Sequence, residues 1–376
     1  MKPTDDTWMK LALRLAARGR GTTSPNPMVG AVLVRRGQVI GQGFHRRAGG
    51  PHAEIEALRD AATRNESPRG ATLFVTLEPC CTHGRTPPCT DAIIAAGIGR
   101  VVVAATDPNP RHAGRGFDVL RAANIPVVTG IAAAAATQLN EVFNHWICTR
   151  TPWVTLKVAQ TLDGKIATAA GASKWITGEG ARREGQRLRR LHDGILMGVE
   201  TVLHDDPALT IRTGKRITCP RRFVLDTRAR TPLGAQLVTD SFASQTTVIV
   251  GEGTAARRIA ALSRHVSVWV APRKDGRIDL AWLMDRLGAP SAGSPVTSLL
   301  VEGGGEVHAG FLHARLAQRF VSFLAPKILG GRDSRRAVGG DGFTSLTECP
   351  RLIDTTTRHL PPDLMFTGRI QYPTTV

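Results

Sequence analysis

Two short segments of the sequence combine residue types that could bind a metal ion and move protons. The first covers residues 51–54 (Pro-His-Ala-Glu), and the second runs from residues 78–80 (Glu-Pro-Cys) to Cys89. One imidazole and two thiolates form a ligand set of catalytic zinc sites, which leave the fourth position to water. Glu54 is not needed as a fourth ligand, so its carboxylate is free to act as a proton shuttle.

The second segment leaves more than one choice of ligand, because eight residues separate Cys80 from Cys89. Cys81 and His83 lie within this interval and are alternative ligands. Cys80 follows a predicted strand and Cys89 opens a predicted helix, and ligands on regular elements are better positioned than ligands in a loop. We therefore predict His52, Cys80 and Cys89 as the zinc ligands. A structural zinc knuckle would leave Glu54 without a role.

A His-x-Glu segment followed by Pro-Cys is the signature of zinc-dependent nucleobase deaminases, in which water attacks a ring carbon that carries an amino group. Asn26 could also belong to such a site, because it stands between two prolines before a predicted strand. Its amide could contact the edge of a pyrimidine. An Asx turn explains the same pattern, and both interpretations are open.

The elements that must position these residues alternate between strands and helices. Strands are expected at 31–34, near 44, at 71–77, 100–105 and 125–128, and helices near 8–16 and at 52–64, 89–96, 117–123 and 133–147. Residues two apart do not share a helix face, so His52 and Glu54 can reach one site only from the first turn of a helix. The alternation favours a three-layer α/β sheet.

The polar, proline-containing stretch at residues 149–152 marks a predicted domain boundary, which gives domains at 1–149 and 150–376. The second half again favours an α/β unit. A strand at 296–301 runs into Glu302 and three glycines before a helix, a pattern that can bind a phosphate or simply turn the chain. Five arginines at 182–190 could seat a phosphate or form a solvated face.

Composition indicates a two-domain globular protein with anionic ligands. The chain has 376 residues and a formal net charge of +18, whereas aromatic residues make up 5%. The charge suits phosphorylated ligands or nucleic acid, but few aromatic residues are present for base stacking. We see neither a signal peptide nor an apolar run of about 18 residues. The cysteines suit a reducing compartment, so we expect a cytoplasmic protein.

Several motifs resemble the bifunctional pyrimidine deaminase–reductases of riboflavin biosynthesis, over essentially the whole chain. In the first half these are residues 24–30 (Ser-Pro-Asn-Pro-Met-Val-Gly), 51–54, 77–80, 84–89 and 107–110 (Asp-Pro-Asn-Pro). In the second half they are residues 162–164, 175–177, 205–210 and 301–304. The resemblance implies a cytidine-deaminase-like three-layer αβα domain followed by a dihydrofolate-reductase-like α/β domain. The long interval between Cys80 and Cys89 is typical of this family.

The resemblance implies one zinc ion per chain, NADPH as the second cofactor and phosphorylated pyrimidine substrates. It implies deamination of 2,5-diamino-6-(5-phosphoribosylamino)pyrimidin-4(3H)-one, with Glu54 as the catalytic group. Reduction of the ribosyl chain of the uracil product to ribityl would follow. A homo-oligomer, a dimer or larger, is expected, with neither nucleic acid nor membrane as a partner.

Site residues follow from the resemblance by matching position. Besides Asn26, the expected substrate contacts are Ser173, Arg189, Leu209, Arg212 and Glu302. The expected NADPH contacts are Ala159, Trp175, Thr201, Asp205, Thr227, Gly304, Gly305, Glu306, Val307, His308, Ala309 and Gly310. Lys157 and Asp163 are candidate catalytic residues of the reduction. The alternative is a zinc deaminase of a nucleobase in RNA, with the second half as a basic RNA-binding module.

Overall fold

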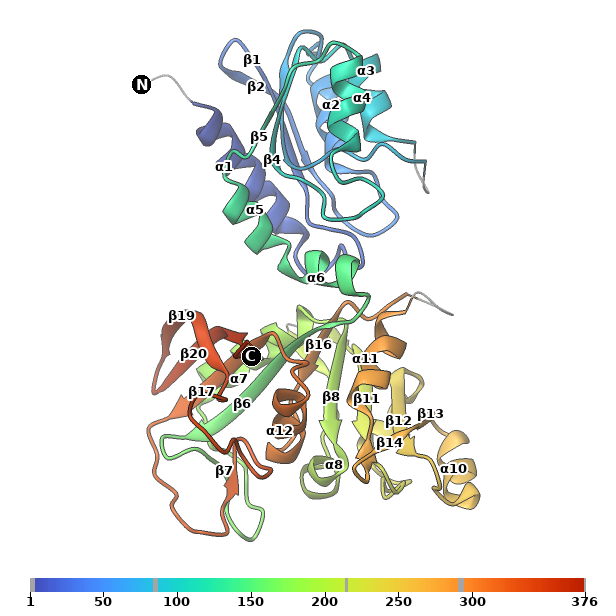
Figure 1. Ribbon diagram of the computed structural model, residues 1–376, viewed down its shortest axis with the longest axis vertical. Coiled ribbons are helices and arrows are strands. Elements are labelled where there is room, and N and C mark those ends of the chain that lie inside the picture. Colours follow the sequence, from blue (N-terminus) through green and yellow to red (C-terminus); the bar gives the residue numbers. More distant parts are fainter. Residues whose placement is uncertain (1–3, 84–86, 214–215, 290–293, 375–376) are drawn as a thin grey trace. The chain divides into compact units, whose positions relative to one another are not determined.

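The computed structural model describes residues 4–83, 87–213, 216–289 and 294–374. The chain divides into two compact units, Met1–Arg150 and Thr151–Val376, next to the expected boundary. Each unit is described by itself below (Figure 1). In the described part of the chain, no helix is long and apolar enough to cross a membrane.

A five-stranded sheet organises the first unit, in the order β2-β1-β3-β4-β5. Its strands are β1 (Gly30–Arg35), β2 (Gln38–Phe44), β3 (Thr72–Leu77), β4 (Arg100–Ala105) and β5 (Val127–Thr129). β1 pairs antiparallel with β2 and β3, whereas β3, β4 and β5 are parallel. Parallel strands place their carboxyl ends at one edge of the sheet, which is where the chain leaves β3 toward Cys80.

Helices cover both faces of this sheet. One face carries α2 (Ala53–Thr63), α3 (Cys89–Ala95) and α4 (Arg115–Ala122), and the other carries α1 (Asp5–Ala16) and α5 (Ala133–Leu139), as Figure 1 shows. Alternate strand side chains supply the two cores: Val101 and Val103 face α2–α4, while Val102 faces α1 and α5. This is the expected three-layer arrangement.

The helix expected over 133–147 is divided in two, so that prediction was wrong in its extent. α5 ends at Leu139 and α6 (Glu141–Thr149) begins after Asn140. The buried Asn140 side chain accepts a hydrogen bond from Met28 N at 2.8 Å and donates one to Met28 O at 2.9 Å. These bonds tie the break between the helices to the loop that precedes β1, which carries Asn26.

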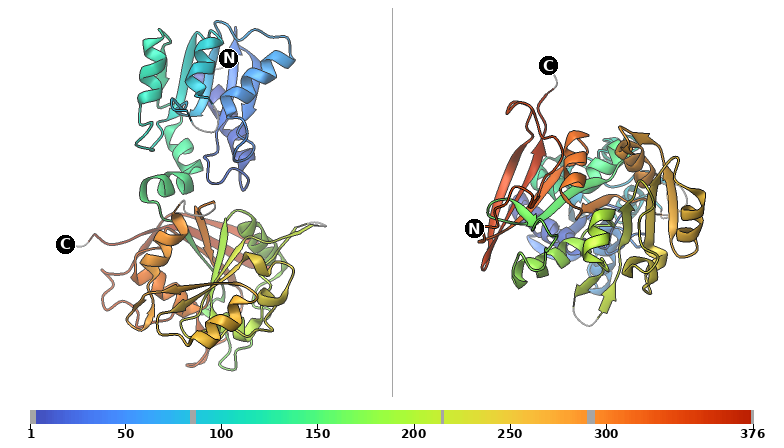
Figure 2. Two further views of the ribbon diagram at one scale, coloured as in Figure 1. Left: turned by 90° about the vertical axis from the view of Figure 1, so that its right-hand side faces the viewer. Right: turned by 90° about the horizontal axis from the view of Figure 1, so that it is seen from below.

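A nine-stranded sheet forms the second unit, in the order β13-β12-β11-β8-β16-β6-β17-β20-β19. The strands up to β17 are parallel to their neighbours, and β20 and β19 add antiparallel pairs. Figure 2 (right) shows these last two strands in red at one edge. The bounds are β6 (Trp153–Thr161), β8 (Gly194–Gly198), β11 (Arg221–Leu225), β12 (Thr246–Gly251), β13 (Ser267–Ala271), β16 (Ser298–Val301), β17 (Arg319–Ala325), β19 (Arg351–Leu360) and β20 (Asp363–Gln371).

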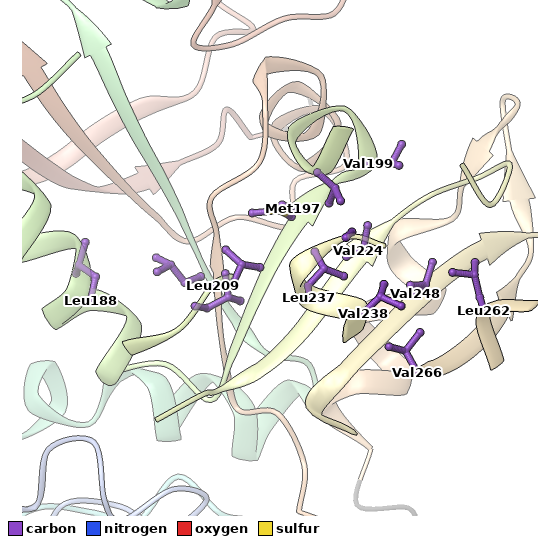
Figure 3. Packing of buried hydrophobic residues seen from close by; sticks show 14 of the residues in the cluster. Leu188, Met197, Val199, Leu209, Val224, Leu237, Val238, Val248, Leu262 and Val266 are labelled. Carbon is purple, nitrogen blue, oxygen red and sulfur yellow. The ribbon is translucent and has the colours of Figure 1, made fainter. Parts of the chain in front are cut away.

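Apolar clusters on both faces hold this sheet between helices. Figure 3 shows the cluster in which Leu188, Val199, Leu237 and Leu262 pack on the strands. These residues come from α7 (Glu179–Arg190), α8 (Val199–Asp205), α9 (Gln236–Thr239) and α10 (Ala256–Ser263). The other face buries apolar side chains of α11 (Leu280–Gly288) and α12 (Gly305–His313). The short pairs are β7 (Lys165–Ala167) with β18 (Arg335–Arg336), β9 (Ile211–Thr213) with β10 (Arg216–Thr218), and β14 (Arg273–Lys274) with β15 (Arg277–Ile278).

Candidate active sites

Three side chains of the first unit meet in the geometry of a metal site. His52 is the N-cap residue of α2, Cys89 is the first residue of α3, and Cys80 follows β3. His52 Nδ1 lies 3.2 Å from Cys89 Sγ and 3.5 Å from Cys80 Sγ. One ligand atom from each of the three residues lies within 4.8 Å of the others. The structure thus brings together the three predicted zinc ligands.

The backbone around these ligands fixes their positions. A Cβ atom at Gly43 of β2 would lie 2.5 Å from Glu56 Cβ, and one at Gly41 would lie 2.4 Å from Ala57 O. Because only glycine fits there, α2 packs directly on β2 and its first turn is held at the edge of the sheet. On the other side, Cys89 N donates a hydrogen bond of 3.3 Å to Cys80 Sγ.

The donor set fits zinc, since soft thiolates combined with imidazole are ligands that zinc accepts. Hydrogen bonds from the Cys89 thiol and the His52 imidazole lower the pKa of the Cys80 thiol to about 4, against the opposing effect of burial. The same contact with Cys80, together with burial, raises the pKa of the Cys89 thiol. The pair therefore shares one proton, which a bound cation would displace.

Glu54 lies in the first turn of α2, and only 3% of its surface is exposed. Burial raises the pKa of its carboxyl to about 7, the nearby Cys80 adds to this effect, and His52 opposes it. A carboxyl group with a pKa near neutrality can both accept and return a proton, which is what general acid–base catalysis requires.

The alternative ligands in the interval between Cys80 and Cys89 lie elsewhere. Cys81 Sγ is 3.7 Å from His112 Nδ1, and the thiol is outside the group formed by the three ligands. His83 is exposed. Residues 84–86 of this interval, which belong to one of the family motifs, lie outside the described residues.

Asn26 is connected to the metal-site ligands through His45, a residue that the sequence analysis missed. Asn26 Nδ2 lies 3.1 Å from His45 Nε2, and His45 Nδ1 lies 2.9 Å from Pro51 O. The imidazole of His45 is buried and meets that of His52 edge to face, with ring centroids 5.5 Å apart. Because Nδ1 donates to the Pro51 carbonyl, Nε2 is the acceptor for Asn26. The side chain of Asn26 is therefore directed toward the metal site.

Glu78 is a second residue that the sequence analysis left without a role. Its buried carboxylate accepts hydrogen bonds from Asp107 N at 3.1 Å, Gly114 N at 2.9 Å and Gly116 N at 2.9 Å. These bonds hold the loop between β4 and α4 against the segment that carries Cys80. The loop contains the motif at 107–110, so Glu78 positions that motif beside the metal site.

In the second unit, a buried carboxylate and two cations form the centre of the predicted substrate site. Glu302 follows β16, and its two oxygens accept hydrogen bonds from Arg189 Nε at 2.7 Å and Arg189 Nη2 at 2.9 Å. Lys157 Nζ of β6 lies 3.5 Å from Glu302 Oε2. Burial alone would raise the pKa of Glu302, but Arg189 and Lys157 lower it to about 2. Glu302 is therefore ionised at neutral pH.

The segment around Leu209 is attached to this centre by its backbone. Arg189 Nη1 donates to Thr210 O at 3.1 Å, and Arg212 Nε donates to Thr210 Oγ1 at 3.1 Å. Leu209 is 1% exposed, counting its backbone and side chain together, and belongs to the core in Figure 3. Leu209 as a whole is thus buried, and neither its backbone nor its side chain is exposed to a substrate in this structure. The arginines of α7 are mostly paired within the protein: Arg183 with Glu179 and Arg187 with Glu184.

Asp163 has its carboxylate occupied by the protein. It accepts hydrogen bonds from Thr161 Oγ1 at 2.6 Å, Leu329 N at 3.0 Å and Gly330 N at 2.7 Å. The bond from Thr161, followed by the two backbone bonds, lowers the pKa of Asp163 to about 2. An ionised carboxylate with these partners suits the anchoring of the loop at 327–331 better than proton transfer.

The predicted cofactor contacts gather at the carboxyl ends of the parallel strands. Ala159 is on β6, Thr201 and Asp205 are on α8 after β8, and Thr227 follows β11. Asp205 Oδ1 accepts a hydrogen bond of 2.7 Å from Ser173 Oγ, which joins a predicted cofactor contact to a predicted substrate contact. Ligands of open α/β sheets bind at this edge.

In the glycine stretch after β16, one position has room for a side chain, whereas neighbouring atoms fill that space at the other two. A Cβ at Gly304 would meet nothing closer than Thr201 Oγ1 at 3.8 Å, whereas one at Gly305 would lie 2.4 Å from Arg336 O and one at Gly303 would lie 3.1 Å from Gly198 N. Gly304 is the N-cap residue of α12. The backbone here is thus accessible to an anion at a helix N-terminus.

Other members of the predicted stretch at 304–310 are buried or are paired with other protein groups. His308 and Ala309 are buried, and His308 Nδ1 lies 2.9 Å from Ala337 O. Glu306 accepts hydrogen bonds from Gly340 N at 2.9 Å and Arg277 Nη2 at 3.0 Å.

Trp175, another predicted cofactor contact, is 66% exposed, and the Arg182 guanidinium lies 4.7 Å from its ring centroid.

Comparisons with known proteins match a different family model to each half of the chain. A family model described as the RibD C-terminal domain matches residues 152–366, and one described as the cytidine and deoxycytidylate deaminase zinc-binding region matches residues 2–105. The riboflavin biosynthesis protein RibD of Escherichia coli is 42% identical over 369 residues, which cover 96% of this chain and 98% of that protein. RibD of Actinobacillus pleuropneumoniae is 39% identical over 362 residues, 96% of this chain and 94% of that protein.

Solved structures give the same result for the fold. RibD of Acinetobacter baumannii superimposes with a TM-score of 0.83 at 36% identity, covering 98% of this chain and 99% of that one. A diaminohydroxyphosphoribosylaminopyrimidine deaminase/5-amino-6-(5-phosphoribosylamino)uracil reductase of Thermotoga maritima gives a TM-score of 0.81 at 34% identity, with the same coverage.

Fold and sites together define a zinc-binding deaminase joined to a reductase. The chain belongs to the RibD family of riboflavin biosynthesis proteins. The expected fold class and family are thereby confirmed. The match of residues 152–366 to the RibD C-terminal domain disfavours the alternative of an RNA-binding module.

Proposed function

We propose that the chain catalyses two successive steps of riboflavin biosynthesis. The first unit deaminates 2,5-diamino-6-(5-phosphoribosylamino)pyrimidin-4(3H)-one. The second uses NADPH to reduce the ribosyl chain of 5-amino-6-(5-phosphoribosylamino)uracil to ribityl. The observation that carries the proposal is the meeting of His52, Cys80 and Cys89 beside the buried Glu54, in a chain whose second unit is a RibD reductase unit.

In the deaminase unit, His52, Cys80 and Cys89 would hold one zinc ion. Zinc in such a site supplies Lewis acidity, which lowers the pKa of water from about 15.7 to about 7. Glu54 would take one proton from the attacking water and deliver it to the ring nitrogen. It would then take the second proton from the hydroxyl group added to the ring carbon and deliver it to the departing amine. Its pKa of about 7 matches both directions of transfer. The buried position of Glu54 keeps bulk water from competing for these protons.

Asn26 would bind the pyrimidine edge in this unit. Its Nδ2 is engaged by His45, so its carbonyl oxygen is the group left to accept a hydrogen bond from the ring. His45 acts here as a positioning residue, because it connects Asn26 to the Pro51 carbonyl next to the ligand His52.

In the reductase unit, Arg189, Glu302 and the segment around Leu209 would bind the substrate, with Ser173 and the exposed Arg212 as further contacts. Lys157 remains the candidate catalytic residue, because its ammonium lies beside Glu302 and can stabilise negative charge or supply a proton. We assign Asp163 an anchoring role instead of a catalytic one. Its carboxylate is engaged by Thr161 and two backbone amides.

NADPH would lie along the carboxyl edge of the sheet, with its pyrophosphate at Gly304 and Gly305. Ala159, Trp175, Thr201, Asp205 and Thr227 would line the rest of its path, and Glu306, Val307, His308, Ala309 and Gly310 would support the first turn of α12. We further propose that residues 1–149 and 150–376 are the functional domains, that the protein is a homo-oligomer, and that it acts in the cytoplasm, where its thiols remain reduced.

The experiment is to give the purified chain the diaminopyrimidine phosphate, with and without NADPH, and to identify the products. Without NADPH, we expect ammonia and the ribosylamino uracil phosphate to accumulate. With NADPH, the ribityl product should form as NADPH is oxidised. Formation of neither product by zinc-loaded protein would contradict the proposal. Salt-sensitive binding of tRNA with no reduction would favour the RNA alternative.

A further inference from the structure

The loop that follows β11 is fixed from within by a buried carboxylate. Asp226 is fully buried, and its Oδ2 accepts hydrogen bonds from Thr231 N at 2.6 Å and Thr231 Oγ1 at 2.7 Å. Ala229 N donates to Asp226 O at 3.0 Å, and Ala229 has φ +53°. The six residues 226–231 therefore form one closed turn whose shape is set before any ligand arrives.

Neighbouring elements hold the same loop from outside. Arg258 of α10 donates to Ala229 O from Nε at 3.0 Å and from Nη2 at 2.7 Å. The Thr227 carbonyl accepts hydrogen bonds from Thr254 Oγ1 at 3.0 Å and Gly251 N at 3.1 Å. These contacts occupy the backbone carbonyls of Thr227 and Ala229 and fix the loop from outside.

Two exposed arginines stand on this rigid loop, and they differ in their partners. Arg230 pairs with Glu200 of α8. Arg228 is exposed, and within the described residues it makes neither a hydrogen bond nor an ion pair. Arginine is always charged and matches phosphate with two parallel hydrogen bonds. Arg228 therefore stands on a fixed backbone with its guanidinium unpaired among the described residues, and so available to a phosphate.

The position of Arg228 relates it to the cofactor path. β11 is separated from β16 by β8 alone, so the two strand ends are about 10 Å apart by the usual strand spacing. The end of β16 leads to Gly304, where the pyrophosphate is proposed to bind, and Thr227 is a predicted NADPH contact. The adenosine half of a dinucleotide covers the interval from one strand end to the other.

We propose that Arg228 binds the 2′-phosphate of NADPH and thereby sets the preference of the reductase for NADPH over NADH. The two cofactors differ only in this phosphate, so the residue that recognises it must carry a positive charge at the adenosine end. Arg228 carries that charge, and it directly follows Thr227, a predicted NADPH contact. This inference rests on the proposed reductase function of the second unit and adds a specificity residue to it.

The test compares two binding probes that differ in the same phosphate, 2′,5′-ADP and 5′-ADP, on the full-length protein by titration calorimetry. Arg228→Ala should weaken binding of 2′,5′-ADP by about 10- to 100-fold, the usual worth of a hydrogen-bonded ion pair, and leave 5′-ADP unchanged. The KM for NADPH should rise by a similar factor while the KM for NADH stays the same.

Arg257→Ala is the matched control. Arg257 is an exposed arginine on α10 with no hydrogen bond or ion pair among the described residues, so this variant removes one positive charge from the same unit. It should leave both probes unaffected. Arg228→Lys, which keeps the charge, should recover part of the lost affinity.

Two results would overturn the assignment of Arg228. One is equal weakening of both probes by Arg228→Ala, and the other is unchanged binding of 2′,5′-ADP. Either result leaves the reductase function standing if the wild-type protein still oxidises NADPH. A wild-type protein that binds neither probe and oxidises neither cofactor would contradict the reductase function as well.

Discussion

The deaminase unit and the reductase unit hold their reactive side chains in different ways. In the deaminase unit, His52 and Cys89 stand at the N-terminal ends of two helices, so the helix backbones set the spacing of the ligands. In the reductase unit, Glu302 is held by Arg189 and Lys157, side chains that reach it from α7 and β6. One site depends on backbone placement, and the other depends on a network of charges.

Because of this difference, a substitution in one site should affect activity alone, whereas a substitution in the other should affect stability as well. Loss of a ligand side chain at a helix end removes one donor and leaves the helix in place. Loss of one member of a buried charge network leaves its partner uncompensated, which is costly. We therefore expect changes in the deaminase site to abolish activity with little loss of stability, and changes at Glu302 to reduce stability as well.

The largest expected effect is loss of zinc. Cys89→Ala and Cys80→Ala should lower the zinc content from about one ion per chain to none, because a catalytic site with three protein ligands does not retain zinc on two. Deamination should be lost together with the metal, while NADPH-dependent reduction continues. Metal analysis of each purified variant, with both half-reactions assayed on the same preparation, measures this outcome.

Cys81→Ala is the matched control, since Cys81 lies next to Cys80 in the chain but contacts His112. It should keep the zinc and the deaminase activity. Normal zinc in Cys89→Ala combined with loss of zinc in Cys81→Ala would show that the ligand assignment is wrong.

Glu54→Gln should have the next largest effect. The amide has nearly the same shape as the carboxyl group, so the fold and the zinc content should persist, but it cannot carry protons. General acid–base catalysis contributes about 10² to 10⁴ in rate, and Glu54 serves several proton steps, so we expect a loss at the upper end. Reduction of the deaminated uracil phosphate by the same preparation should proceed at close to the wild-type rate.

Two outcomes of the Glu54→Gln experiment would contradict this account. Deamination that survives would mean that Glu54 is not the proton shuttle. A parallel fall of both activities with zinc retained would mean that the two active sites are not independent.

The sequence predicts a site well where local motifs position its residues, and poorly where contacts between distant residues position them. The zinc ligands and Glu54 fall within short motifs at strand and helix ends, where local pattern indicates both residue type and position. His45 could not be predicted from local pattern, because its hydrogen bond with Asn26 forms only when two segments 19 residues apart meet in the fold. The break between α5 and α6 was missed because Asn140 is bound to Met28, 112 residues away.

The reductase site illustrates the same limit more strongly. The pattern around residues 182–190 could not distinguish a phosphate-binding helix from a solvated one, since Arg189 finds Glu302 across 113 residues. Likewise, nothing local to Leu209 indicates that its side chain is buried. Contacts between distant residues are products of the packed fold, and periodicity carries no information about them.

Glu302→Gln should have the third largest effect, and the stability that it costs should depend on pH. The pKa of Glu302 is lowered to about 2 in the folded protein, against about 4.3 in an unfolded chain. A lowered pKa contributes stability above pH 4.3 and loses it as the pH falls toward 2. The substitution should therefore cost about 3 kcal/mol at pH 7 and about half of that at pH 3.

Urea unfolding of both proteins at both pH values measures this change, since the difference between the proteins cancels other titrating groups. A cost that is equal at pH 7 and pH 3 would show that the charge of Glu302 is not what stabilises the reductase unit.

Gly304→Val should have the smallest effect, and it separates the cofactor site from the fold. A Cβ at Gly304 would meet no protein atom closer than 3.8 Å, so the unliganded protein has room for a branch point at this position. Valine is a poorer N-cap residue than glycine, at a cost of about 1 kcal/mol. A bound pyrophosphate would need the same space, so the clash should raise the KM for NADPH by about tenfold or more, without a change in deamination.

Gly305→Ala should affect the fold rather than the cofactor site, in contrast to Gly304→Val. Its Cβ would lie 2.4 Å from Arg336 O, so this smaller substitution should lower the stability of the reductase unit even without cofactor. Thermal unfolding and NADPH titration of both variants make the comparison. A folded Gly304→Val protein with wild-type affinity for NADPH would mean that the glycine stretch only turns the chain, and the pyrophosphate would then have to bind elsewhere along the strand ends.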